Sequence, residues 1–522
     1  MRILVLADLG QSVYHVGDEA MGIAVGDALR ERGFEIAYAT RSEEHTRAFI
    51  DADAQTVATL EFPWAPAERE QFLEELRMFL AEGEGPAEIR AFVETLSGFG
   101  GIVIAGGGNM NSRYGWLLYE RAAYGLLARH LQIPLIISGQ SFGPVLTAHD
   151  AGVLDELLDS ARAVSAREPG SVAYARQRGR AVFAGIDDAS FYTMGSRSLT
   201  QTKVAELPER YLCVTLNQLD DAQVPLMARL LDRVYETYQL TTVFLPHMGT
   251  PVNDDADAAL HARVAAAMEH DALLLPILHT DQAVAIHCSA VAGLSSRYHP
   301  AIFSLSAAVP FVALLPDAFT DQRVRGAMSH FGAEDYAVPM ALLSESGVDT
   351  VWGAVDEVLC HRDALHQQLN QRVAELKSYS QSYWDAVAEA LRGSESTLLE
   401  VNSAQKLSVT EDLAGNSAAL SAESSQQMNP LWRPIAHVLR DQLAGLSLAA
   451  HRAEADLDRA LTWDAAHRAQ RDEARQLADS PKGNTVEQAR MRELVAELVK
   501  RLKSAGPAAV LSKVTTGLRK RT

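Results

Sequence analysis

Residues 290–312 read AVAGLSSRYHPAIFSLSAAVPFV and show how the chain is built. The short apolar run that ends at Leu294 predicts a buried strand. The pattern from Pro300 predicts an amphipathic helix, and a second strand follows Pro310. Proline is favourable in the first turn of a helix, because its missing N–H has no partner there. Strands and helices that alternate in this way predict an α/β protein with a mostly parallel, doubly wound sheet.

Arg297 and His299 lie where the predicted strand passes into the helix N-terminus. In open α/β sheets, ligands bind at this carboxyl edge of the strands. Arginine offers a planar fork of donors that suits a carboxylate or a phosphate, and histidine exchanges a proton near neutral pH. The pair fits an anionic substrate that must be protonated. A helix-capping arginine beside a satisfied core histidine fits the same residues.

The same alternation continues through most of the chain and predicts two similar α/β halves with a cleft between them. We expect the first domain at 1–200 and the second at 205–392, closed by a long helix over about 348–391. Strands are expected at 2–8, 34–40, 101–105, 134–138 and 163–166, and then at 211–216, 242–245, 272–275, 290–294, 309–314 and 336–338.

The composition changes beyond the second domain. Residues 393–430, rich in Ser, Ala, Gln and Asn, predict a linker, and 431–480 predict a helical or coiled-coil segment. Residues 482–522 predict a basic amphipathic tail, because they hold ten Lys or Arg against three Glu. Such a tail either lies on anionic lipid or packs on the acidic body of the protein.

Composition also limits the classes of function. The chain has 522 residues and a net charge of -20, which argues against a nucleic-acid partner. Its three cysteines are widely spaced and indicate reduced thiols in a cytoplasmic protein. No apolar run approaches the roughly 18 residues of a membrane span. No metal site is expected, because the sequence has no metal-binding spacing of histidines or cysteines.

Glycine-rich and polar loops follow most of the predicted strands. Glycines let a ligand approach the backbone closely, and helix N-termini favour anions. A single loop of this kind is often a plain tight turn, but repeated placement at strand ends predicts a binding site. The candidates are Gly17, Asp18, Gly106, Gly107, Gly108, Asn109, Arg167, Ser171, Asp187, His247 and Ser296, beside Arg297 and His299.

In order and spacing, these loops resemble the polysaccharide pyruvyl transferase family over about the first 330 residues. The matching motifs are VGDEAM, IVIAGGGN, ISGQSFGP, SAREPGS, GIDDASF, FLPHMGT and most of the opening stretch. The resemblance implies two Rossmann-like, GT-B-like domains. It also implies a transferase that moves the enolpyruvyl unit of phosphoenolpyruvate onto sugar hydroxyls as a ketal. The key basic and acid residues would then be Arg297 and His299.

The sequence departs from this family at two places. His15-Val16 precedes Gly17 where the family usually shows an asparagine, a change that could alter the acceptor or mean lost activity. Tyr298 replaces the more usual leucine between the arginine and the histidine, and it is similar in bulk.

The resemblance also guides the assignment of roles. Phosphoenolpyruvate carries a carboxylate and a phosphate, so its pocket needs at least two fixed cations or helix N-termini. Arg297 and Arg167 are the first candidates, and Arg113 is the third. Ketal formation needs a proton on the methylene carbon, for which His299 is the expected general acid. Asp18 or Asp187 would accept a hydroxyl proton.

No cofactor is expected beyond phosphoenolpyruvate as the donor substrate. The expected partner is a sugar or lipid-linked glycan of a cell-surface polysaccharide or glycolipid, met in the cytoplasm or at the inner face of the membrane. A homo-oligomer is compatible with the sequence.

Two other functions remain open. One is a GT-B glycosyltransferase with a nucleotide-sugar donor, although no Asp or Glu occurs between Asp281 and Asp317, where many such enzymes hold the donor. The other is a non-catalytic scaffold, against which the presence of both Arg297 and His299 counts.

Overall fold

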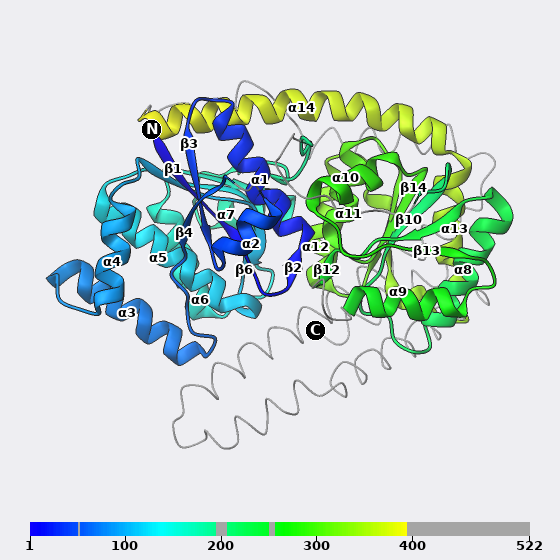
Figure 1. Ribbon diagram of the computed structural model, residues 1–522, viewed down its shortest axis with the longest axis horizontal. Helices are drawn as coiled ribbons and strands as arrows, with labels where there is room; N and C mark the ends of the chain where they lie inside the picture. The colour runs from blue at the N-terminus through cyan, green and yellow to red at the C-terminus, as the bar shows by residue number, and fades with distance from the viewer. Residues whose placement is uncertain (51–52, 195–205, 250–255, 394–522) are drawn as a thin grey trace, which may run out of the picture.

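The computed structural model describes residues 1–50, 53–194, 206–249 and 256–393. These residues form two parallel β-sheets packed between α-helices, and the two halves lie side by side (Figure 1). This arrangement confirms the predicted α/β fold with two Rossmann-like halves. The predicted linker, helical segment and basic tail lie, from residue 394 on, outside the described residues. Within the described ranges, no helix is both long and apolar enough to cross a membrane.

The first sheet has the strand order β4-β3-β1-β5-β7-β8-β9, with β6 beside β7. All these pairs are parallel, and the strand order changes direction between β1 and β5, which is the switch point where Rossmann folds bind ligands. The strands are β1 (Arg2–Leu9), β3 (Glu35–Thr40), β4 (Gln55–Ala58), β5 (Gly101–Ile104), β6 (Gly107–Met110), β7 (Leu135–Phe142), β8 (Ala163–Ala166) and β9 (Phe183–Ala184). The helices are α1 (Val16–Arg30), α2 (Glu43–Phe49), α3 (Pro66–Glu82), α4 (Ala87–Leu96), α5 (Gly115–Leu131), α6 (Ala148–Ser160) and α7 (Pro169–Gln177).

The second sheet has the order β13-β11-β10-β14-β15-β16 and its own switch point between β10 and β14. The strands are β10 (Tyr211–Thr215), β11 (Thr241–Phe244), β13 (Ala272–Leu274), β14 (Ala292–Ser295), β15 (Phe311–Leu315) and β16 (Ala337–Pro339). The helices are α8 (Val224–Tyr238), α9 (Ala256–Ala267), α10 (Thr280–Ser289), α11 (Tyr298–Ser306), α12 (Ala318–Ser329), α13 (Val348–Cys360) and α14 (Arg362–Arg392).

Strand β1 lies inside the first sheet and sends alternate side chains into two cores. Leu4 and Leu6 pack on the face that α5 covers, whereas Ile3 and Val5 pack on the face that α14 covers. Because both faces are buried, the strand is apolar at every one of these positions, as is typical of parallel sheets.

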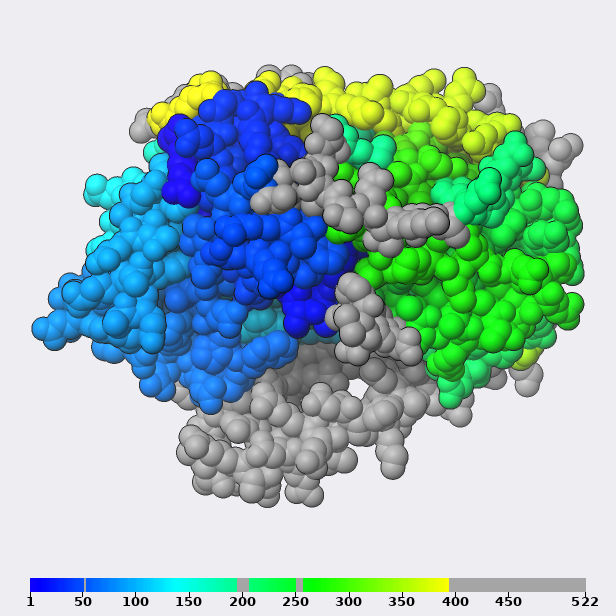
Figure 2. Space-filling model, viewed as in Figure 1, coloured from blue at the N-terminus to red at the C-terminus, as the bar shows by residue number. Residues whose placement is uncertain are grey.

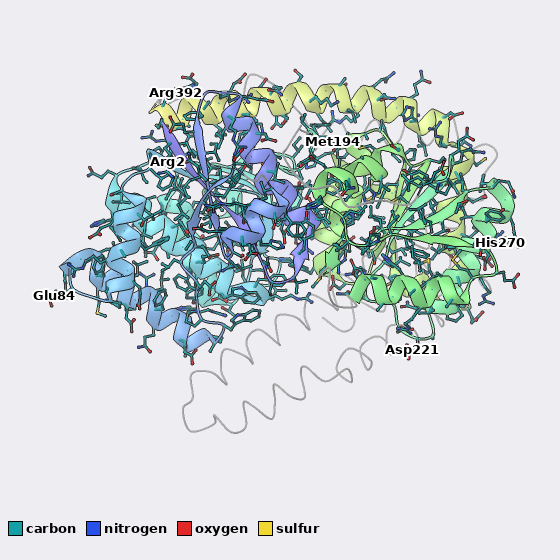
Figure 3. The ribbon with its side chains drawn as sticks, viewed as in Figure 1. Arg2, Glu84, Met194, Asp221, His270 and Arg392 are labelled. Carbon is teal, nitrogen blue, oxygen red and sulfur yellow. The ribbon has the colours of Figure 1, made fainter. Side chains whose placement is uncertain are left out.

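Helix α14 spans both halves. Leu369 in its first third belongs to the core of the second half, and Leu391 near its end belongs to a core of the first. Its 31 residues give a length of about 46 Å at 1.5 Å per residue. It runs along one edge of the molecule and over both halves (Figures 1 and 2). Figure 3 shows Arg392, at its end, near Arg2 of β1.

A small antiparallel sheet also joins the halves. Strand β2 (Tyr14–His15) of the first half pairs with β12 (Met248–Gly249) of the second, and His15 lies opposite Met248. The backbone N–H of Val16 then donates to the carbonyl of His247 at 3.0 Å. The first turn of α1 is therefore fixed against the end of β11.

The structure corrects the predicted helix over 348–391. The chain breaks at His361, where φ is -105° and ψ is 19°, and forms α13 and α14 instead of one helix. The sequence analysis also missed α12, because the segment AFTDQRVRGAMS mixes charged residues and a glycine into a weak apolar pattern. It missed α2 and β4 for a similar reason, since both are short and largely polar.

We expect Leu391→Ala to lower the free energy of unfolding by about 2–5 kcal/mol, because it leaves a cavity between α14 and the first sheet. The side chain is 3% exposed. Ser378→Ala, at an exposed position of the same helix, is the matched control and should change stability by less than about 0.5 kcal/mol. Urea unfolding of both variants measures the difference. Equal stability would show that the end of α14 does not hold the first sheet.

Candidate active site

The carboxyl edges of the two sheets face each other where the halves meet. From the first half come the beginning of α1, the glycine turn Gly106–Gly108 after β5, and the loops after β8 and β9. From the second come the loops after β11 and β14 and helix α12 after β15. The loops singled out in the sequence therefore gather at one place, as the rule for ligand sites in open sheets predicts.

The imidazole of His299 packs directly on Gly17 at the beginning of α1. A Cβ on Gly17 would lie 1.8 Å from Nδ1 of His299, so this contact between the halves requires glycine. The ring stacks on Phe303 at a centroid distance of 6.0 Å and meets Tyr298 edge to face at 5.0 Å. Its Nε2 is buried and has no hydrogen-bond partner in the described part of the chain. A buried donor or acceptor without a partner is costly, which indicates a place for a ligand atom.

The electrostatic surroundings keep His299 neutral. Burial lowers the pKa of His299 to about 4, and the charges of Arg167 and Arg323 act in the same direction. Asp187 and Asp18 oppose this effect. A bound anion would favour the protonated imidazole instead, since an opposite charge stabilises the charged form.

Arg167 follows β8 and is 1% exposed. Its Nη1 donates to Asp187 at 2.6 Å and its Nε donates to the hydroxyl of Ser141 at 2.9 Å. The guanidinium lies 4.3 Å from the ring centroid of Tyr298. Arg167 is therefore held rigidly, with Asp187 balancing part of its charge.

Arg323 is a site residue that the sequence analysis missed. It projects from α12 toward the glycine turn, where a Cβ on Gly108 would lie 2.3 Å from Nη1 of Arg323 and 3.0 Å from Nη2 of Arg167. No carboxylate among the described residues lies within 4.0 Å of its guanidinium. Burial, followed by the charge of Arg167, lowers its pKa. Two guanidinium groups that converge in this way suit an anion, and we call this convergence the candidate anion site.

Hydrogen bonds to Asp188 hold the glycine turn in place. The carboxylate of Asp188 accepts the N–H of Gly106 at 2.7 Å and the hydroxyl of Ser138 at 2.6 Å. Tyr383 of α14 in turn donates to that hydroxyl at 2.8 Å. Burial raises the pKa of Asp188 to about 7. Asn109, at the end of the turn, has a buried Oδ1 without a partner in the described residues.

Arg297 is paired within its own half. Its Nε and Nη2 each donate to the carboxylate of Asp257 at 2.6 Å, and Asp257 is fully buried. Asp257 also accepts the N–H groups of His247 and Met248, both at 3.1 Å. The charge of Arg297 is thus balanced, and its side chain remains 20% exposed at the edge of the site.

His247 and Ser296 support the second half of the site. The Nε2 atoms of His247 and His287 are 2.7 Å apart, and burial holds the pKa of His247 well below its usual range. Ser296 accepts the N–H of Asn217 at 2.7 Å and donates to its side-chain oxygen at 2.6 Å, which ties β14 to β10.

Asp18 lies beside His299 at the beginning of α1. Its carboxylate is 3.2 Å from Nδ1 of His15, and the two side chains are 28% and 31% exposed. Burial would raise the pKa of Asp18, but the hydrogen bond to His15 and the charges of His15, His299 and Arg167 lower it. His15, one of the departures from the family pattern, is therefore part of the site.

Two other predicted residues lie at the margins. Ser171 is buried, hydrogen-bonds to Glu168 and accepts the N–H of Phe142 at 2.7 Å. It therefore stabilises the loop that carries Arg167. Arg113 is 41% exposed and lies 3.5 Å from Asp317 at the rim. Among the described side chains, no group of three or more His, Cys, Asp or Glu converges as metal ligands.

A cavity of about 540 Å³ lies beside the site, between α1, α10 and α14. It shares Asp188 and Phe303 with the site. None of the arginines or histidines described above lines it, so this cavity is separate from the candidate anion site at Arg167 and Arg323.

Comparison with known proteins places this sequence in a family. Residues 15–317 match the family model of polysaccharide pyruvyl transferase, which includes every site residue predicted from the sequence. No curated protein sequence matches significantly.

Among solved structures, the fold is similar to UDP-GlcNAc 2-epimerase from Neisseria meningitidis bound to UDP-GlcNAc, with a TM-score of 0.50 at 8% identity over 76% of this chain and 100% of that one. It is also similar to the glycosyltransferase SnogD from Streptomyces nogalater, with a TM-score of 0.41 at 16% identity over 74% of this chain and 99% of that one. At such identities the likeness to the epimerase shows the fold alone. The family model spans more than half of the sequence, and the chain belongs to the polysaccharide pyruvyl transferase family.

Proposed function

We propose that this protein transfers the enolpyruvyl unit of phosphoenolpyruvate onto two hydroxyls of a sugar acceptor and releases phosphate. The observation that carries the proposal is the convergence of Arg167 and Arg323 on Gly108, next to a histidine whose Nε2 has no hydrogen-bond partner among the described residues. A small donor with two anionic groups fits two guanidinium groups, and its reactive carbon needs a proton donor within reach.

Two residues, His299 and Asp18, handle the proton transfers of the reaction. His299, protonated in the complex, gives its proton to the methylene carbon, which becomes a methyl group while the neighbouring carbon becomes electrophilic. The first sugar hydroxyl adds to that carbon and loses its proton to Asp18. The carbon–oxygen bond to phosphate then breaks, and phosphate leaves with the proton from Asp18. The second hydroxyl closes the ketal, and its proton restores His299.

Asp18 suits the role of the base better than Asp187 does. Asp187 is 2% exposed and is committed to Arg167, whereas Asp18 is partly exposed and is paired with His15. The lowered pKa of Asp18 keeps its carboxylate ionised before the reaction. Arg297 would act at the edge of the same site, where Asp257 fixes its orientation.

The direct test is phosphate release from phosphoenolpyruvate in the presence of sugar acceptors, with mass spectrometry of the product. A product that carries a ketal-linked carboxyethylidene group supports the proposal. UDP- and dTDP-sugars are assayed in parallel, because they are the donors of the alternative, a GT-B glycosyltransferase. Sugar transfer from a nucleotide, without ketal formation from phosphoenolpyruvate, would contradict the proposal.

We expect Arg323→Gln to raise the KM for phosphoenolpyruvate about 10- to 100-fold, since a hydrogen bond to a charged group is worth about 1.5–3 kcal/mol. Arg323→Lys keeps the charge and should recover part of the loss. Arg325→Gln is the matched control, because Arg325 lies on the same helix and pairs with Asp321 at 2.9 Å. Steady-state kinetics separate the variants. An unchanged KM in Arg323→Gln would rule out its contact with the donor.

We expect the binding of phosphoenolpyruvate to place a proton on His299. In the protein without ligand the pKa of His299 is about 4, so His299 is unprotonated at neutral pH. The bound anion raises the pKa of His299. Between these two pKa values the complex holds more protons than the free protein, so affinity falls as the pH rises from about 4 toward the pKa of the complex and levels off above it.

Calorimetry in two buffers of different ionisation enthalpy measures this uptake. His299→Gln should take up fewer protons than the wild type and lose about 10²–10⁴-fold in kcat. His130→Gln, at an exposed position of α5, is the control. Equal proton uptake in His299→Gln and wild type would exclude His299 as the acid.

A further inference from the structure

Four aromatic rings form a continuous row from the surface to the candidate anion site. The aromatic row consists of Trp64, Trp116, Tyr114 and Phe319. Trp64 stacks on Trp116 at a centroid distance of 3.8 Å, and Trp116 meets Tyr114 edge to face at 5.8 Å. Tyr114 in turn lies 6.1 Å from Phe319. Three rings belong to the first half and one to the second, so the row crosses the junction of the halves.

The inner end of the row contacts the proposed donor site. The guanidinium of Arg323 lies 3.9 Å from the ring centroid of Phe319, and the same guanidinium faces Gly108. Asn111, which is fully buried, also connects the glycine turn to the aromatic row. Its Nδ2 donates to the carbonyl of Gly108 at 2.9 Å, and its Oδ1 accepts the N–H of Tyr114 at 3.1 Å.

The outer end of the row is fixed but open to solvent. Trp64 is 68% exposed, although its backbone carbonyl accepts a hydrogen bond of 3.1 Å from Arg69, which is 6% exposed. The same guanidinium lies against Gly115, where a Cβ would approach it to 2.3 Å. A rigidly held, exposed tryptophan marks an interaction site, because its large apolar face gains free energy only when a partner covers it.

The surroundings of the row favour a carbohydrate as that partner. The flat face of an aromatic ring packs on the apolar C–H face of a pyranose, while the sugar hydroxyls need polar groups at the edge of the ring. Arg113 provides such a group, since its guanidinium lies 5.8 Å from the Tyr114 centroid and 5.5 Å from that of Phe319. Asp317, 3.5 Å from Arg113, offers acceptors. A net charge of -20 disfavours the nucleic acids that also stack on aromatic rings.

We propose that the aromatic row binds the acceptor glycan, on the sugar units that extend outward from the one that reacts. This inference rests on the proposed function, because the row is assigned to the acceptor of that reaction. It predicts that the protein prefers oligosaccharides over monosaccharides, and that the preference is set by Trp64 and Trp116 rather than by the groups that hold the donor.

The test compares wild type with Trp64→Ala, Trp64→Tyr and Met78→Ala. Met78 is 47% exposed on α3, the helix that follows Trp64, and it serves as the matched control. The probes are gluco-, galacto- and manno-oligosaccharides of one, three and five units. Their binding is measured calorimetrically without donor, and their KM is measured with phosphoenolpyruvate present.

We expect the affinity of the wild type for at least one series to rise with chain length. Trp64→Ala should weaken the binding of its five-unit member about tenfold, equal to about 1.4 kcal/mol, and leave the monosaccharide and the KM for phosphoenolpyruvate unchanged. Trp64→Tyr should restore most of the loss, and Met78→Ala should match the wild type.

Three results would overturn the inference: no dependence of affinity on length in the wild type, equal binding by Trp64→Ala and wild type, or a loss that is equal for one and five units. Because binding is measured without donor, absent ketal formation with intact, length-dependent binding would contradict the proposed function and leave the row supported.

Discussion

The contact between His299 and Gly17 is the constraint on which the site depends. It brings the N-terminus of α11 from one half against the N-terminus of α1 from the other, with the imidazole in the place that a Cβ would occupy. The short β2–β12 sheet and the hydrogen bond from Val16 to His247 hold the same junction. The two switch points therefore face each other at a fixed distance, and a small ligand can touch residues of both halves at once.

The three arginines near this junction differ in how far carboxylates balance their charges. Arg297 is balanced by a buried carboxylate, and Arg167 is partly balanced by Asp187, whereas Arg323 contacts no carboxylate among the described residues. Arg167 and Arg323 lie near an imidazole that burial keeps neutral, with Asp187 and Asp18 also close, so an anion between the two guanidinium groups would find donors at low dielectric. A bound anion would favour the protonated form of His299, because an opposite charge stabilises the charged imidazole.

The sequence predicted the sheets, the strand-end loops and the family well, because buried parallel strands are apolar at every position and their loops keep residue types that bind ligands. It placed Arg167, Asp18 and His299 at one site for the same reason. It missed Arg323, which lies on a polar helix beyond the matched residues 15–317 and becomes significant only through its position against Gly108. It named Arg297 together with Arg167 as the first cations, but the pairing of Arg297 with the distant Asp257 could not be read from local spacing.

Helix α14 connects the two halves of the molecule to the glycine turn. It is anchored in both halves, and Tyr383 on it leads through Ser138 and Asp188 to the amide of Gly106. The helix that spans both halves is thereby joined, through two side chains, to the backbone of the turn that faces the arginines, so the position of that turn depends on the packing of both halves.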